Sequence, residues 1–145
     1  MRVLGLDVGT KRTGVALSDE TKLLASPLTV IEAKNKKIWT DSIKKLVSEH
    51  EVESVVVGLP LNHHGEEGED AKNIRIYIAL LQEQLAVPVI EWDERFTTAQ
   101  AERTLIHADV SRQNRKQIID KVAASILLQS YLDSLRFEKA PTWDD

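Results

Sequence analysis

Residues 1–14, MRVLGLDVGTKRTG, form the segment around which the rest of the chain is expected to be organised. Residues 2–8 have the apolar character of a short strand, which ends with a single carboxylate, Asp7. A glycine follows two residues later, where we expect a side chain to crowd whatever binds that carboxylate. Thr10 and Lys11 then supply a hydroxyl group and a positive charge. This combination suits a metal ion that holds a phosphate, while an ordinary hairpin with Asp and Gly as turn formers is the alternative.

The composition is that of one domain without disulfide bonds. The chain has 145 residues, no cysteine and a formal net charge of −4, and at this length roughly two thirds of the unfolded surface can be buried. The N-terminus lacks the basic start and unbroken apolar core of a signal peptide, and no apolar run approaches the roughly 20 residues that span a bilayer. We therefore expect a cytoplasmic protein with no membrane segment. The acidic balance argues against a general nucleic-acid coat protein but not against a nuclease.

The hydrophobic pattern predicts three strands followed by alternating helices and strands. Expected strands cover residues 2–8, 14–18, 23–31, 53–59 and 87–92, and expected helices cover residues 35–49, 71–85, 97–107 and 111–135. The later strand–helix–strand repeats require parallel pairing with right-handed crossovers. We predict an α/β fold with a mixed five-stranded sheet, antiparallel over its first three strands and then parallel, with helices on both faces. One domain, residues 1–137, would precede a loose tail, residues 138–145.

Sites in such sheets form beyond the carboxyl ends of the strands, and this rule selects the candidate residues. Asp7 ends the first strand, and Asp93 and Glu94 end the last one. Because neighbours on a strand point to opposite faces, we expect only one of these two to join a shared site. Asn62 is the polar residue that follows the central strand. Asp120, inside the long last helix, is the third candidate, and its alternative is an exposed residue that pairs with a nearby lysine.

Three carboxylates from two strand ends and one helix could hold two divalent ions. Hard oxygen ligands select Mg²⁺ or Mn²⁺ over zinc, and two such ions hydrolyse phosphodiesters by activating a water and steadying the leaving oxygen. The first half of the last helix is basic, with Arg112, Arg115, Lys116 and Lys121. A basic helix beside an acidic cluster suits the grip of a nucleic-acid backbone. The lysine-rich face of the expected helix at residues 35–49 is interpreted as solvated surface, and residues 63–70 as a mobile acidic loop.

Four blocks of the sequence resemble the YqgF (RuvX) family. They are residues 6–11 with 14–16, residues 57–62, residues 92–98 and residues 120–124. The similarity extends from residue 2 to about residue 135, and the four blocks are specific in combination. Members of this bacterial family are described as pre-16S rRNA nucleases and also as Holliday junction resolvases, with an RNase H-like fold.

The resemblance implies metal-dependent phosphodiester cleavage. It suggests Asp7, Glu94 and Asp120 as the acidic triad, and so it prefers Glu94 over Asp93. Many RNase H-like nucleases carry an acid at the end of the central strand, where this chain has Asn62. Glu94 on the adjoining strand would substitute for that acid, and the number of bound metal ions stays open.

The leading hypothesis is a cytoplasmic endonuclease that depends on Mg²⁺ or Mn²⁺ and matures the 5′ end of 16S rRNA, with ribosomal particles as a further partner. The expected substrate contacts are Thr10, Lys11, Asn62, Arg95 and Arg115. The alternative substrate is a four-way DNA junction in recombination, for which a homodimer would supply paired sites. Two rivals are a non-catalytic module that binds nucleic acid or the ribosome, and an ATP-binding domain of the actin and sugar-kinase type. The second rival needs a longer chain.

Overall fold

The computed structural model describes residues 1–60, 67–93 and 112–139, and only the backbone within residues 112–120 and 136–139. The elements are β1 (Arg2–Val8), β2 (Thr13–Ser18), β3 (Ala25–Ile31), α1 (Lys36–Glu49), β4 (Val52–Leu59), α2 (Glu69–Gln84), β5 (Val89–Asp93) and α4 (Arg112–Lys139). All five expected strands and three of the four expected helices are present. The expected helix at residues 97–107 lies outside the described residues. In the described part of the chain, no helix is long and apolar enough to cross a membrane.

The five strands form one mixed sheet in the order β3-β2-β1-β4-β5. β1 and β2 are antiparallel, as are β2 and β3, whereas β4 pairs in parallel with both β1 and β5. The predicted change from antiparallel to parallel pairing is therefore confirmed. Pro27 lies on the edge strand β3, next to a register irregularity opposite Val15 and Ala16, as the sequence predicted for a residue that cannot donate a ladder hydrogen bond.

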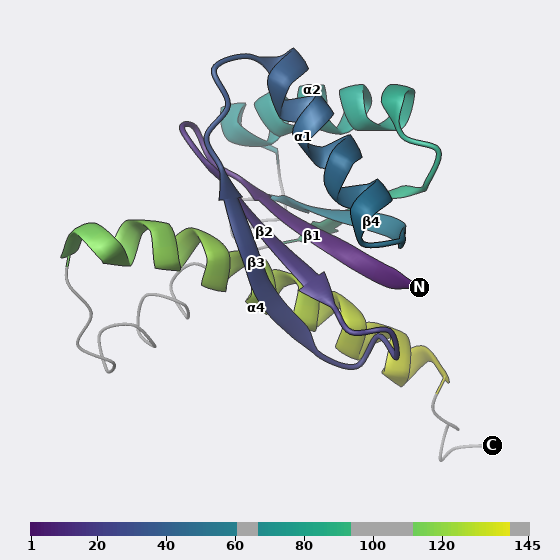
Figure 1. Ribbon diagram of the computed structural model, residues 1–145. Helices are drawn as coiled ribbons and strands as arrows, with labels where there is room; N and C mark the ends of the chain where they lie inside the picture. Colours follow the sequence, from purple (N-terminus) through teal and green to yellow (C-terminus); the bar gives the residue numbers. More distant parts are fainter. Residues whose placement is uncertain (61–66, 94–111, 140–145) are drawn as a thin grey trace.

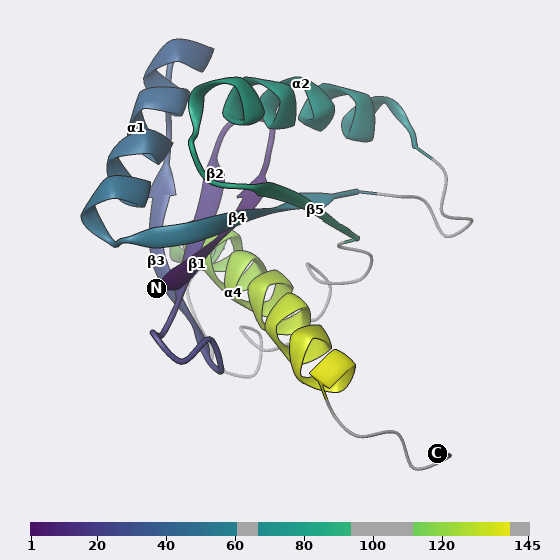
Figure 2. The same cartoon turned by 90° about the vertical axis from the view of Figure 1, so that its right-hand side faces the viewer.

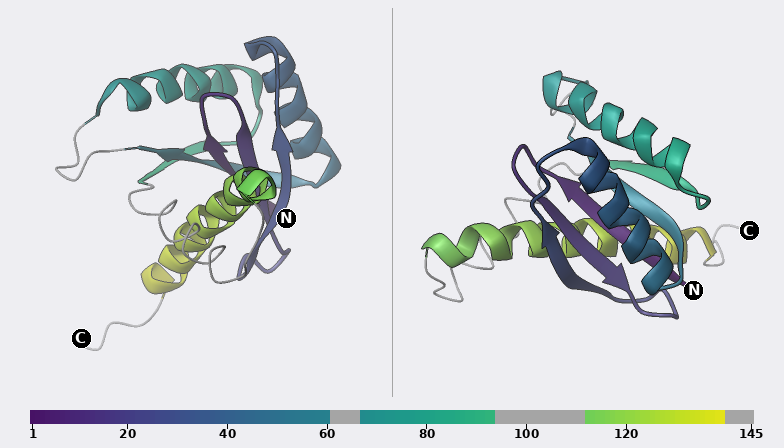
Figure 3. Two further views of the ribbon diagram at one scale, coloured as in Figure 1. Left: turned by 90° about the vertical axis from the view of Figure 1, so that its left-hand side faces the viewer. Right: turned by 45° about the horizontal axis from the view of Figure 1, so that its top comes forward.

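Helices cover both faces of this sheet, as expected (Figures 1 and 2). Strand alternation sends Leu4, Leu6 and Val8 of β1 into the larger core beneath α1 and α2, together with Trp39 and Ile43. The intervening residues face α4, where a second core is built from Val3, Ala16, Val56, Ala124, Leu128 and Leu132. Figure 3 shows α4 crossing below the sheet while α1 and α2 pack on the other side.

Two helix boundaries differ from the prediction. α2 begins at Glu69, inside the segment expected to be a loop, and its first turn holds Glu69 and Asp70. Carboxylates in a first turn interact favourably with the helix dipole, which explains why this acidic stretch is helical. α4 continues to Lys139, beyond the end expected near Leu135. Residues 138 and 139, which were expected to belong to the loose tail, are therefore helical. Residues 140–145 lie outside the described residues.

Candidate functional site

Asp7 lies near the carboxyl end of β1, half-buried, on the face of the sheet that α4 covers. Its antiparallel partner on β2 is Gly14. On the other side, Leu6 pairs with Val57, and the residue after Val57 is Gly58 of β4. Neighbours in a row across a sheet point to the same face, so the Asp7 carboxylate lies between two positions without side chains. Within this row, no neighbouring Cβ crowds the carboxylate, which is a hard oxygen ligand.

α4 runs antiparallel to β1 across this face. At the start of β1, the Val3 amide donates to Ser18 Oγ of β2. Ser18 pairs with Ala25 of β3, and the Ala25 amide donates to the side chain of Gln129 of α4 at 2.9 Å. Two residues further along β1, a Cβ on Gly5 would lie 2.8 Å from Leu128 Cβ and 3.4 Å from the carbonyl oxygen of Ala124. Moving along β1 toward its carboxyl end therefore corresponds to moving along α4 toward its N-terminus.

That direction brings the backbone of residue 120 toward Asp7. Asp120 lies one helical turn before Ala124, a step of about 6 Å, and Asp7 lies two strand residues after Gly5, a step of about 7 Å. Both steps lead from the same contact between α4 and β1 toward the same end of the sheet. The side chain of Asp120 is not among those described, so its part in the site remains a prediction.

Asp93, one of the two neighbouring candidate acids, is the last residue of β5. Glu91 Oε1 accepts from Arg75 Nη1 of α2 at 2.7 Å, whereas the next residue, Trp92, packs on Tyr131 of α4 with ring centroids 5.4 Å apart. Alternation then directs Asp93 to the α2 face, opposite to Asp7. Of the two neighbouring acids, Asp93 is thus placed on the α2 face and Glu94 lies outside the described residues, so the choice of Glu94 over Asp93 stays a prediction.

The turn between β1 and β2 explains Gly9 differently from the prediction. Its amide donates to the carbonyl of Arg12 at 2.8 Å, and a Cβ on Gly9 would lie 2.8 Å from that same oxygen. The tight turn is by itself a sufficient reason for this glycine, and the expectation that it also clears space for a ligand of Asp7 stays a prediction. Thr10 and Lys11 are exposed at the tip of this turn. Asp7 itself is a paired residue of β1 and not a turn former, whereas Gly9 lies in the turn, so the plain-hairpin alternative holds for Gly9 alone.

A cavity of about 160 Å³ lies between this turn and the first turns of α2. Thr10 and Pro60 line one side, and Asp70, Asn73 and Ile74 line the other. Neither Asp70 nor Asn73 was predicted as a site residue, because the sequence assigned Asp70 to a loop and Asn73 to a helix with no expected role in a site. The useful signal is the pair of adjacent acids, which is typical of a helix start.

A charged cluster ties the start of α2 to β5. Arg75 donates to Glu67 through Nε at 2.5 Å and to Glu91 through Nη1 at 2.7 Å. The hydrogen bond from Arg75 holds the pKa of Glu67 below its ordinary value, and the two carboxylates raise the pKa of Arg75. These groups are solvent-exposed, so we assign the cluster a role in orienting α2 and no role as a ligand.

Several predicted site residues cannot be placed. Asn62, Glu94 and Arg95 lie outside the described residues, and Arg115 is described only as a backbone position on α4. Within the described part of the chain, no group of three or more His, Cys, Asp or Glu side chains is placed to hold a metal ion. Of the predicted triad, the structure therefore locates the Asp7 side chain and the backbone of Asp120.

Comparison with known proteins identifies the family. The family model described as "RuvX: Holliday junction resolvase" matches residues 1–134. The chain belongs to the RuvX family. A protein of Listeria monocytogenes serotype 4b (strain CLIP80459), named "Putative pre-16S rRNA nuclease", is 50% identical over 136 residues, covering 92% of this chain and 99% of that protein. A protein of the same name from Thermoanaerobacter pseudethanolicus is 45% identical over 135 residues, covering 92% and 97%.

Solved structures support the RNase H-like fold of this RuvX-family chain. The resolvase of Fowlpox virus, bound to Holliday junction DNA, superposes with a TM-score of 0.57 at 18% identity, covering 93% of this chain and 99% of that one. RuvC of T. thermophilus, bound to a Holliday junction substrate, gives a TM-score of 0.55 at 15% identity, covering 93% and 96%. The predicted family and fold are therefore confirmed.

Proposed function

We propose that this RuvX-family protein is a metal-dependent endonuclease that hydrolyses phosphodiester bonds in structured nucleic acid. The observation that carries the proposal is the position of Asp7 at the carboxyl end of β1, between Gly14 and Gly58 and on the face crossed by α4. A carboxylate flanked in its row by two glycines, and approached by the backbone of a second acidic residue, is suited to hold a divalent ion. The names of the relatives and the family description support the same activity.

The ligands we propose for that ion are Asp7, Glu94 and Asp120. Asp93 faces α2, so a strand continued by one residue would direct Glu94 toward the face of Asp7. Asp120 follows from the course of α4 along β1. An oxygen-only set of this kind prefers Mg²⁺ or Mn²⁺, and when bound such an ion supplies an activated water and stabilises the charge that develops on phosphate.

The chain's own residues would orient the nucleic acid around these acids. Thr10 and Lys11 are exposed at the turn that follows β1, three and four residues after Asp7. Arg115 precedes Asp120 by about one and a half turns of α4. We propose that these three residues, with Asn62 and Arg95, bind phosphate and sugar oxygens and hold the scissile bond against Asp7. Cation contacts of this kind fix the position of the backbone without reading its sequence.

Precursor 16S rRNA, cut at its 5′ end, is the substrate that we propose first, because relatives identical at 45–50% carry that name. Such a protein would work in the cytoplasm and meet its substrate on ribosomal particles. The second candidate is a four-way DNA junction, favoured by the description of the family model. For a two-fold junction, a homodimer would place two Asp7 sites for paired cuts.

The decisive experiment compares pure wild type with Asp7→Asn on precursor 16S rRNA and on a four-way DNA junction. In Mg²⁺ or Mn²⁺ we expect cleavage by wild type, abolished by chelator, and a loss of about 100-fold or more in the variant. Asp41→Asn, an exposed acid on α1, is the matched control and should cleave like wild type. Equal cleavage by Asp7→Asn would remove Asp7 from the site. Binding of both substrates by wild type without any cleavage would instead identify a non-catalytic module.

A further inference from the structure

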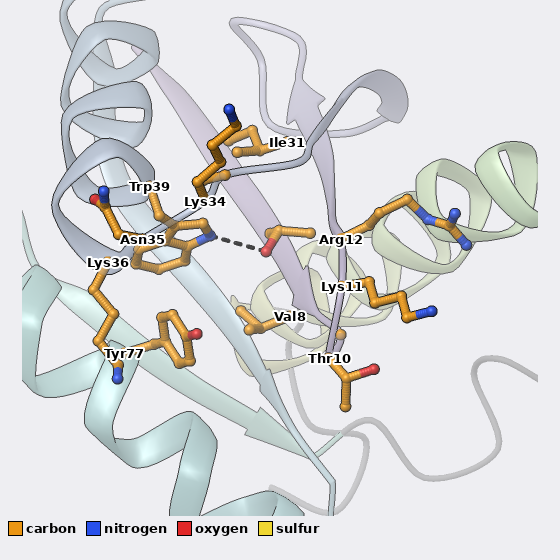
Figure 4. Close-up of a pocket in the computed structure, with 13 residues that line it drawn as sticks. Val8, Thr10, Lys11, Arg12, Ile31, Lys34, Asn35, Lys36, Trp39 and Tyr77 are labelled. Carbon is orange, nitrogen blue, oxygen red and sulfur yellow. Dashed lines mark hydrogen bonds between the residues drawn. The ribbon is translucent and has the colours of Figure 1, made fainter.

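A second, larger cavity lies on the other side of the β1–β2 turn from the Asp7 site. It has a volume of about 340 Å³ and is bounded by the turn, by the segment after β3 and by the start of α1 (Figure 4). Four of its lining residues are cationic, namely Lys11, Arg12, Lys34 and Lys36, and none of its described lining residues is acidic. A volume near the lower end of the range for ligand sites is ample for a phosphate group.

The apolar side of this cavity is preformed. Trp39 is buried, and its indole Nε1 donates to Thr13 Oγ1 at 2.9 Å. The Trp39 ring packs edge to face against Tyr77 of α2, with centroids 4.8 Å apart. These contacts join β2, α1 and α2 behind the cavity, so a ligand would meet a wall that is already ordered.

The cations come from two segments that are separate in the sequence. Figure 4 shows Lys34 and Lys36 on the α1 side, with side chains that lead away from the Trp39 indole in opposite directions, while Lys11 and Arg12 extend from the turn on the side away from Trp39. Lys36 Nζ lies 5.8 Å from the centroid of the Tyr77 ring. Neither Lys34 nor Lys36 forms an ion pair with a described side chain.

The charge pattern at the start of α1 opposes the helix dipole. The first turn of α1 contains no acidic residue and includes Lys36, while Asn35 caps the helix by accepting from the amide of Ile38 at 2.9 Å. Cations at a helix N-terminus are unfavourable by a few tenths of a kcal/mol, whereas an anion there is stabilised. An anion in the cavity would meet the favourable end of the dipole together with Lys34 and Lys36.

We propose that this cavity binds a phosphate group of the nucleic-acid strand at a point away from the bond that is cut. The inference rests on the proposed nuclease function. The β1–β2 turn connects the two places, because Asp7 precedes it on the face that α4 covers, and Gly9 and Arg12 of the turn line the cavity. A strand held at Asp7 and laid across the turn would reach the cavity with its backbone.

The test compares two double variants of the full chain, Lys34→Gln/Lys36→Gln at the cavity and Lys44→Gln/Lys45→Gln near the other end of α1. Lys44 and Lys45 are exposed and line none of the described cavities near the turn, so the control removes the same charge from the same helix. Binding of a labelled 5′ fragment of precursor 16S rRNA is measured by fluorescence anisotropy in chelator, over a range of salt. We expect the cavity variant to bind roughly tenfold more weakly at low salt, with a salt slope smaller by about 1 to 2, and the control to remain near wild type.

Equal affinity of the two double variants would overturn the proposal. A parallel titration with AMP and with inorganic phosphate distinguishes the source of the phosphate group. If wild type binds these small anions and the cavity variant does not, while both bind the RNA equally, the cavity takes a free phosphate compound and the strand proposal is wrong. Binding is measured in chelator, where no cleavage occurs, so the two functions are tested separately. If the cavity variant binds the RNA more weakly than the control, but wild type does not cleave in Mg²⁺ or Mn²⁺, the nuclease function is rejected and the phosphate site is retained.

Discussion

Gly5 of β1 and Leu128 of α4 are in such close contact that a Cβ added to the glycine would lie 2.8 Å from the Leu128 Cβ. The obstructing atom is fixed to the helix backbone, so rotation of the leucine side chain cannot relieve the clash. This contact therefore sets the distance between α4 and the centre of the sheet. Asp7 lies on the β1 side of this interface, two residues after Gly5. Asp120 lies on the α4 side, about two helical turns before Leu128.

Gly5→Ala should destabilise the protein and also reduce nuclease activity. Overpacking of a filled core costs about 1–3 kcal/mol, more than the roughly 0.4–1 kcal/mol that Gly→Ala contributes through the unfolded chain. The helix would have to move away from β1, which would separate residue 120 from Asp7. Urea unfolding followed by circular dichroism measures the first effect, and cleavage well below the unfolding transition measures the second.

Gly68→Ser is the control for an added side chain. A Cβ at Gly68 has no atom within 4 Å, and Gly68 occupies the N-cap of α2 without a side-chain cap. Serine is a preferred N-cap residue, so we expect unchanged or slightly increased stability and wild-type cleavage. Wild-type stability in Gly5→Ala would mean that α4 adjusts freely, and the contact would then not position Asp120.

Asp93→Asn and Glu94→Gln should differ sharply in cleavage. Asp93 is directed to the α2 face, away from Asp7, so its substitution should change the cleavage rate by less than about twofold. Loss of a metal ligand at Glu94 should cost more than the roughly 10- to 100-fold that loss of an outer-shell partner costs. Single-turnover cleavage at saturating Mn²⁺ measures both. The reverse order of effects would show that Asp93 is the ligand.

Thr13→Val should destabilise the wall behind the cationic cavity. In the wild type, the buried indole Nε1 of Trp39 donates to Thr13 Oγ1 at 2.9 Å. Valine has nearly the same volume as threonine but offers no acceptor to this donor. An unsatisfied buried donor costs about 1–3 kcal/mol. Thr13→Ser retains the hydroxyl and should lose less stability than the valine variant. Urea midpoints of the two variants give the comparison, and a valine variant as stable as the serine variant would contradict this account.

Asp19 should give the β2–β3 turn a stability that depends on pH. Its carboxylate accepts from Thr21 Oγ1 at 2.6 Å and from the amides of Leu23 and Leu24 at 2.9 and 3.2 Å. These hydrogen bonds, that of Thr21 first, lower the pKa of Asp19 in the folded state. The contribution is therefore fully present above the ordinary pKa of aspartate and is lost as the pH falls through the lower folded-state value.

The measurement for Asp19 is the difference in Tm between wild type and Asp19→Asn as a function of pH. Wild type should be more stable near neutral pH, and the difference should shrink in acid as Asp19 is protonated. Glu20→Gln, at the exposed neighbouring position outside these hydrogen bonds, should show no such trend. A difference that stays constant into acid would assign the effect of Asp19 to geometry and not to charge.

The sheet could be predicted from the sequence because its signals are local. β1 alternates between two apolar layers, and the run from Val55 to Val57 is buried on both faces as a central strand should be. The start of α2 was missed because its acidic first turn has the composition of a loop. The end of α4 was missed because its apolar face ends before the helix does.

The candidate site was only partly predictable, for reasons of three-dimensional placement. Asp7 was found from its strand end. The side of the sheet on which Asp93 lies could be assigned only once β5 was known to pack on α4 through Trp92. The cationic cavity was not predicted, because Lys34 and Lys36 look like an ordinary solvated helix face. They lie near the β1–β2 turn only after the sheet and α1 have assembled.

The alternation of β1 also links correct folding to chemistry. If β1 slipped by one residue against β2, Asp7 would enter the apolar layer beneath α1, and Val8 would take its place beneath α4. Burial of an unpaired carboxylate in that layer costs several kcal/mol, so the slipped chain would be unstable as well as inactive. The acid that we propose as a metal ligand therefore also disfavours the wrong strand register. Molecules that fold stably are those in which Asp7 lies on the α4 face.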